Sequence, residues 1–170
     1  CDTVETAFAW KYAIENNNGP TCLILSRQSC DYQKRDNEKI ALIQKGAYVL
    51  KDSQNFDLIL ISTGSEVSIT MQAAIELEKE NIHVRVVSMP SMEIFEKQDE
   101  LYKDSVLPKE CTNRIAVEAG SETAWYKYVG LNGCIVSINN FGASAPGNTL
   151  MDYYGFTINN IIDIVKETLK

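Results

Sequence analysis

The chain has 170 residues and a formal net charge of −7, because 16 Lys and Arg stand against 23 Asp and Glu. Apolar residues make up 45% of it and charged residues 23%, which is typical of a soluble globular protein. It has no run of about 18 apolar residues and no basic segment followed by an apolar stretch, so we expect neither a membrane span nor a signal peptide. The acidic balance argues against nonspecific nucleic-acid binding, which needs clustered Lys and Arg.

The five cysteines are an odd number, and none forms a CxxC pair or stands with a His at zinc spacing. We therefore expect free thiols and a cytoplasmic location. The chain opens at Cys1 rather than at Met, directly on a predicted helix start. We interpret it as a piece of a longer polypeptide.

The first predicted element is a helix from Asp2 to about Asn16. Asp2 and Glu5 form a variant of the capping box, and apolar residues then recur along one stripe. The stretch 17–20 (NNGP) ends this helix. Residues 21–26 (TCLILS) are a continuous apolar run, which predicts a buried strand of a parallel sheet.

The next stretch, 29–40, is polar and has no period, which predicts a linker and a domain boundary. Strands and helices then alternate to the end of the chain. We predict strands over 46–51, 57–62, 83–88, 114–118 and 134–138, and helices over 65–80, 93–104, 125–129 and 157–170. This alternation predicts an α/β fold, an open, mostly parallel twisted sheet with helices on both faces.

Ligands of such sheets bind beyond the carboxyl ends of the strands. Three loops qualify, at 62–66, 88–91 and 118–121. In the first, free backbone N–H groups at a helix start could hold an anion, but capping by Ser65 is the commoner arrangement. Glu118 could act as an acid or base or could simply bond its own loop.

Two basic residues also need an interpretation. His83 is the single histidine, and we interpret it as an ordinary residue at a strand edge. Arg27 follows the apolar run 21–26, at the kind of strand end that faces an active site. A guanidinium suits paired contact with a phosphate or a carboxylate, although a surface salt bridge with Asp31 is the alternative.

Seven segments, in the right order along the chain, resemble the transketolase family, most closely its bacterial type. They are GPTCLILSRQ (19–28), DLILISTGSEV (57–67), HVRVVSMPS (83–91), SVLPKECTNRIAVEAG (105–120), WYKYVGLNG (125–133), FGASAP (141–146) and YGFT (154–157). The resemblance implies that residues 1–30 are the tail of a pyrimidine-binding domain, 31–45 a linker, and 46–170 the C-terminal α/β domain. Ala143 and Glu93 depart from the usual residues of the family.

The resemblance also implies a function for the full-length parent. It is a cytoplasmic homodimer of the pentose phosphate pathway that moves a two-carbon ketol unit between sugar phosphates, using thiamine diphosphate and Mg²⁺. The Arg of the family's Ser-Arg-Gln motif contacts the substrate phosphate, and this role carries over to Arg27. The GDG segment, the active-site histidines and the activating glutamate are missing. We therefore expect no catalytic, cofactor-binding or metal-binding residue here, an inactive isolated chain, and a structural, dimer-supporting role.

Two alternatives remain at this point. The chain could be the C-terminal domain of another thiamine-dependent enzyme, such as a deoxyxylulose-phosphate synthase or a ketoacid dehydrogenase β subunit. It could also be a stand-alone regulatory module that binds an anion or a nucleotide. The Ser26–Gln28 motif and the FGASAP segment favour transketolase.

Overall fold

A five-stranded sheet forms the centre of the computed structural model, which describes residues 1–170. Its strands, in the spatial order β1-β3-β2-β4-β5, are β1 (Tyr48–Lys51), β2 (Leu58–Ser62), β3 (Val84–Ser88), β4 (Arg114–Val117) and β5 (Cys134–Val136). Every neighbouring pair is parallel except β1 and β3, which are antiparallel. The mostly parallel sheet is therefore confirmed.

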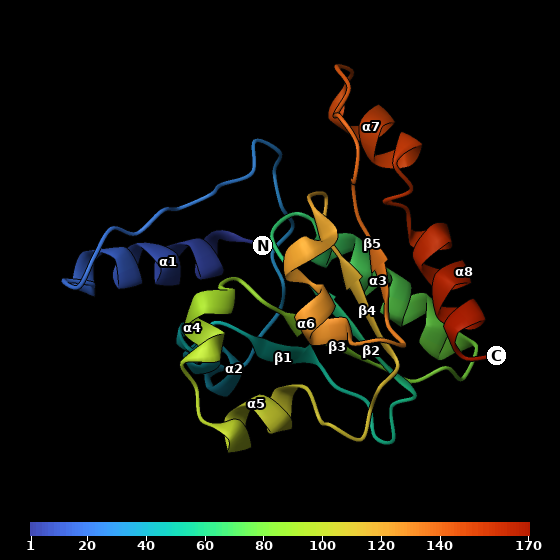
Figure 1. The fold of residues 1–170 in the computed structure, drawn as a ribbon, viewed down its shortest axis with the longest axis horizontal. Coiled ribbons are helices and arrows are strands. Elements are labelled where there is room, and N and C mark those ends of the chain that lie inside the picture. Colours follow the sequence, from blue (N-terminus) through green and yellow to red (C-terminus); the bar gives the residue numbers. More distant parts are fainter.

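Helices lie on both faces of this sheet, as predicted (Figure 1). The α-helices are α1 (Thr3–Glu15), α2 (Asn37–Leu42), α3 (Glu66–Lys79), α4 (Met92–Glu96), α5 (Glu100–Val106), α6 (Tyr126–Val129), α7 (Gly147–Tyr153) and α8 (Ile158–Thr168). Two 3-10 turns complete them, at Ile43–Lys45 and Glu122–Ala124.

The alternation of side chains along β2 explains this layering. Leu58 and Leu60 point to one face, where they join the apolar side chains of α3 and α8. Ile59 and Ile61 point to the other face, where they meet Phe95 of α4 and the aromatic residues around α6. All four β2 side chains are fully buried, and each contributes about 1.5–3 kcal/mol to folding on transfer from water.

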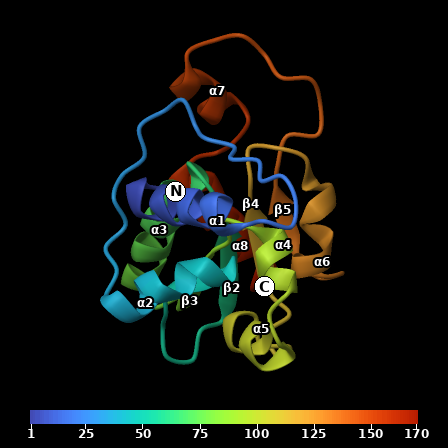
Figure 2. The same ribbon diagram turned by 90° about the vertical axis from the view of Figure 1, so that its left-hand side faces the viewer.

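The helix α1 extends from one side of the molecule in Figure 1, and Figure 2 looks at that side. Asp2 caps it as predicted, because its carboxylate accepts hydrogen bonds from the N–H groups of Val4 and Glu5. Glu5 does not complete a capping box, since its side chain turns toward the sheet instead. The start of α1 is therefore attached to the strands while its far end projects.

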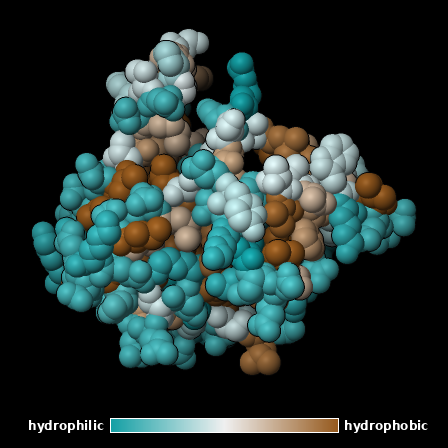
Figure 3. Space-filling model, turned by 180° about the vertical axis from the view of Figure 1, so that it is seen from behind, coloured by the Kyte–Doolittle hydropathy of each residue, from teal (hydrophilic) through white to brown (hydrophobic).

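The prediction of a strand over 21–26 is wrong for this chain. These residues form no strand, and Ile24 and Leu25 are 92% and 57% exposed. A parallel strand needs neighbouring strands to accept and donate its backbone hydrogen bonds, and no strand of the sheet pairs with this run. Seen from behind, the molecule carries several apolar patches among its hydrophilic surface residues (Figure 3).

The polar stretch 29–40 contains local structure that its lack of an apolar period did not indicate. Asp36 caps the short helix α2, and Gln33 and Arg35 are buried. Their burial could not be read from hydrophobic periodicity, because both side chains are polar.

Three other boundaries also differ from the prediction. The helix over 93–104 breaks into α4 and α5, because Asp99 caps a new helix. The helix α7 was not predicted. β1 begins only at Tyr48, since Gly46 has a positive φ of 87° and packs so closely that a Cβ there would lie 2.4 Å from the Phe95 nitrogen.

Hydrogen exchange should separate the sheet from the exposed run. We expect amides in β2 and β3 to exchange more slowly than those in 21–26 by roughly two decades or more, because only the former are buried in a hydrogen-bonded ladder. Exchange measured by mass spectrometry on the 170-residue chain tests this. Equal protection in the three segments would contradict it.

Candidate functional site

A cleft of ≈360 Å³ lies between α1, the segment 22–30 and the carboxyl ends of β2 and β3. Its walls come from parts of the chain that are distant in sequence, including Ser26 and Gln28 on one side and Thr63, Gly64 and Pro90 on the other. This is the sheet edge at which the fold predicts a ligand.

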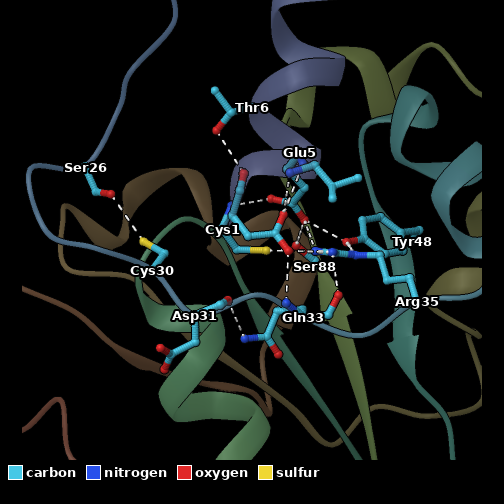
Figure 4. A network of polar contacts seen from close by, with 12 residues as sticks. Cys1, Glu5, Thr6, Ser26, Cys30, Asp31, Gln33, Arg35, Tyr48 and Ser88 are labelled. Atoms are coloured by element: carbon cyan, nitrogen blue, oxygen red, sulfur yellow. Dashed lines mark hydrogen bonds and ion pairs between the residues drawn. The ribbon is translucent and has the colours of Figure 1, made fainter.

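Arg27 stands between two of these wall residues, on an exposed bend. The bend is held locally, because the Ser26 hydroxyl donates to the Gln28 carbonyl at 3.2 Å and lies 3.3 Å from the Cys30 sulfur (Figure 4). The alternative salt bridge with Asp31 does not form, since the Asp31 carboxylate instead accepts from the Ser68 hydroxyl at 3.0 Å. No carboxylate lies within ion-pair distance of Arg27.

A buried polar network closes the inner end of the cleft (Figure 4). The Arg35 guanidinium donates to the Asp2 carboxylate at 2.6 Å and to the Tyr48 hydroxyl at 2.7 Å. Tyr48 in turn donates to Glu5 at 2.7 Å, and the Ser88 hydroxyl donates to the same carboxylate oxygen at 2.6 Å. The network thus joins α1, the stretch before α2, and strands β1 and β3.

The charges of this network support one another. Burial opposes ionisation of Asp2, but hydrogen bonds from Arg35 and from the N–H groups of Gln33 and Glu5 outweigh it and lower the pKa of Asp2. Burial and the Glu5 carboxylate both raise the pKa of Tyr48, which stays a neutral donor. The Arg35–Asp2 pair therefore remains ionised across the working pH range.

Sequence reasoning did not find this network. Glu5 was noticed only as part of a capping box, and Arg35 lay in a stretch with no apolar period. The one available signal was a basic residue followed by a helix cap, Asp36, which is common on protein surfaces. Neither pattern indicates which strands such residues would meet.

The loop 62–66 does not contain the predicted helix cap. Ser65 makes no side-chain cap, and its hydroxyl donates to the Glu66 carboxylate at 2.7 Å. Glu66 is itself buried, and burial raises its pKa, although hydrogen bonding from the Ser65 hydroxyl and from backbone N–H groups opposes this rise. A negative side chain already lies at the start of α3, which disfavours binding of an external anion there.

Glu118 lies beside this loop, and one of its carboxylate oxygens is buried without a hydrogen-bond partner. Burial, with a smaller contribution from the negative charge of Glu66, raises the pKa of Glu118 to about 7. His83 is exposed, and only its backbone N–H bonds a carboxylate, that of Asp57 at 3.2 Å. The structure therefore agrees with an ordinary edge position for His83.

No group of three or more His, Cys, Asp or Glu side chains is arranged to hold a metal ion. None of the helices combines the length and the apolar character that crossing a bilayer requires.

Comparison with known proteins gives one consistent result. The family described as the transketolase-like TK C-terminal domain matches residues 46–157. Transketolase 1 of Escherichia coli (strain K12) is 52% identical over 170 residues, 99% of this chain and 26% of that protein. Transketolase 2 of Aliivibrio fischeri is 51% identical over the same shares.

Solved structures agree. Transketolase from Leishmania mexicana has a TM-score of 0.91 at 36% identity. The match covers 99% of the present chain and 24% of the Leishmania mexicana chain. A transketolase complex with sedoheptulose-7-phosphate from Pichia stipitis has a TM-score of 0.89 at 35% identity, over the same shares. The chain thus spans about a quarter of the length of the relatives it matches.

Proposed function

Since this chain belongs to the transketolase family, we propose that it is the C-terminal portion of an enzyme that moves a two-carbon ketol unit between sugar phosphates. The observation that carries the proposal is the match over nearly the whole chain to transketolases at about half identity. We further propose that the domains divide as the resemblance implies, with 1–30 from the pyrimidine-binding domain, 31–45 a linker, and 46–170 the C-terminal domain.

The contribution that we propose for this portion is one substrate-binding residue, Arg27. Its guanidinium is exposed, free of acidic partners and flanked by residues that line the cleft. A guanidinium offers a phosphate two parallel donors in a fixed plane and stays charged at any working pH. Binding the remote phosphate also helps to orient the reacting carbonyl. A relative that has been crystallised with sedoheptulose-7-phosphate supports a phosphorylated sugar as the ligand class.

The cofactor chemistry belongs to the rest of the polypeptide. We propose that the full-length parent uses thiamine diphosphate and Mg²⁺, which supply the carbanion chemistry of ketol transfer. The residues of this chain do not form a metal site, so we assign no step of that chemistry to them. Their part is to bind the substrate phosphate and to support the fold and a homodimer in the cytoplasm.

The two alternative functions have less support. The family match names the transketolase-like domain, which favours transketolase over other thiamine-dependent enzymes. A stand-alone module that binds an anion at the start of α3 has less support, because the Glu66 carboxylate already lies there and accepts from the Ser65 hydroxyl.

The isolated chain is expected to bind neither thiamine diphosphate nor Mg²⁺ tightly and to transfer no ketol unit. Calorimetric titration of the 170-residue chain with both ligands, beside the same titration and a coupled ketol-transfer assay on the full-length protein, tests the proposal. The full-length protein should show saturable binding and activity. Micromolar saturable binding by the isolated chain, or an inactive full-length protein with its cofactors, would contradict the assignment.

A further inference from the structure

We infer that Asp2 and Arg35 are positioning residues for Arg27, because their contact fixes the downstream end of the bend that carries it. This inference rests on the proposed function of Arg27 as the phosphate-binding residue. Arg35 is buried and does not line the cleft, and Asp2 is buried at the inner wall of the cleft with its carboxylate bonded to α1 and to Arg35.

The Asp2 carboxylate is bonded to two residues that follow the bend, Gln33 and Arg35. One oxygen of the Asp2 carboxylate accepts from the Arg35 guanidinium at 2.6 Å and from the Gln33 N–H at 3.0 Å. The same Arg35 nitrogen also donates to the Gln33 carbonyl at 2.8 Å. Gln33 is therefore held by both its N–H and its carbonyl. We call Asp2, Gln33 and Arg35 the clamp.

The clamp is in turn fixed to the sheet. The Arg35 Nε donates to the Tyr48 hydroxyl of β1, and Tyr48 and Ser88 of β3 both donate to Glu5. Each of these contacts is buried, and most involve an ionised group. Such charge-assisted bonds are roughly twice as strong as neutral ones and are little weakened by solvent, so the clamp is the rigid end of this segment.

The bend between Arg27 and the clamp has only weaker attachments. The Ser68 hydroxyl reaches Asp31 at an exposed position. Gln28 lies against Gly147 at the start of α7, where an added Cβ would come 3.1 Å from the Gln28 amide nitrogen. Because Gln33 follows Arg27 by a short stretch, a shift of the clamp moves the guanidinium away from the phosphate it would bind.

Steady-state kinetics of the full-length protein test this inference. The key variant is Arg35→Lys, which keeps the positive charge but cannot contact Asp2, Gln33 and Tyr48 together. We expect KM for a phosphorylated ketose donor to rise about three- to tenfold. We expect kcat, and kcat/KM for the unphosphorylated donor hydroxypyruvate, to stay within about twofold.

Asp2→Asn is the second variant, because its single amide oxygen can keep the cap of α1 only by turning the NH2 group toward the donors of Gln33 and Arg35, which bond the other carboxylate oxygen of Asp2. It should raise KM for the phosphorylated donor in the same direction. Arg85→Lys is the matched control, since it removes a guanidinium paired with Asp52 at 2.9 Å near the opposite end of β3. It should leave both donors unaffected.

A double variant separates this inference from the proposed function on which it rests. If the clamp acts through Arg27, then Arg27→Ala with Arg35→Lys should be no worse on the phosphorylated donor than Arg27→Ala alone. The inference would be overturned by additive losses in the double variant, by equal losses on both donors for Arg35→Lys, or by no effect of either clamp variant. In each of these cases the proposed function of Arg27 would still hold, provided that Arg27→Ala loses activity mainly on the phosphorylated donor. Equal losses on both donors for Arg27→Ala itself would instead remove the proposed function.

Discussion

Replacing Arg27 by Ala in the full-length protein is expected to lower kcat/KM for phosphorylated sugars by about one to two decades. The substitution removes a charge-assisted contact to a dianionic phosphate, worth about 1.5–3 kcal/mol, and about 1.4 kcal/mol corresponds to a factor of ten. The loss should fall mainly on KM, because the phosphate is remote from the reacting carbonyl and is bound in the ground state as well as in the transition state.

The comparison of two donors makes this result specific. Hydroxypyruvate has no phosphate, so its kinetic constants should change much less than those of a phosphorylated ketose. Arg27→Lys should recover part of the loss but not the paired geometry of the guanidinium. Equal losses on the two donors would mean that Arg27 acts through the fold rather than through the phosphate.

The stability of the chain provides an independent check. Arg27 is exposed and forms no ion pair, so its replacement by Ala should change the free energy of unfolding of the 170-residue chain by less than about 0.5 kcal/mol. Urea denaturation of both chains measures this change. A larger loss of stability would show that a contact of Arg27 within the fold has been removed.

The strands and the long helices of the C-terminal domain could be predicted from local pattern, because each element carries its own signal. Residues 57–62 are apolar on both faces, and the structure buries β2 on both faces. Strand direction has no such signal. The run at 46–51 is as apolar as its neighbours, and only the sheet shows that β1 is antiparallel to β3.

The candidate site was less predictable, because it depends on contacts between distant residues. The apolar run 21–26 has the composition of a buried strand, but composition does not say whether a partner strand is present. The role of Arg35 could not be predicted either, because its partners Asp2 and Tyr48 are present in the chain but lie 33 and 13 positions away in sequence. Arg27 was singled out because it follows a predicted strand, which does not form in this chain, and its role stays a prediction.

Glu118 gives the second large effect, a stability that falls as the pH rises. Its pKa is about 7 in the folded chain against an ordinary value of 4.5, because burial and the nearby Glu66 disfavour the charged form. Between these two values the folded state holds a proton that the unfolded state has lost. The contribution of Glu118 to the free energy of unfolding is therefore largest below about pH 4.5. It falls as the pH rises to about 7 and stays constant above that value.

The variant Glu118→Gln removes this titration while keeping the shape of the side chain. At pH 8 we expect the variant to be more stable than the original chain by about 1–2 kcal/mol, a figure reduced for the partial exposure of the group. Near pH 4.5 the pH-dependent difference should vanish, because the original Glu118 is then protonated in the folded state. Urea denaturation of the 170-residue chain at a series of pH values measures this difference.

The control for this experiment is Glu110→Gln, which replaces an exposed carboxylate that makes no ion pair. Its effect on stability should be small, because an exposed carboxylate interacts weakly with its surroundings in both states. Other groups titrate over the same range, but they do so equally in the original chain and in the variant, so the difference isolates Glu118. Glu66 is the exception, since the two carboxylates are coupled and the midpoint belongs to the pair. A difference between Glu118→Gln and the original chain that stays constant from pH 4.5 to 8 would show that Glu118 is already charged throughout.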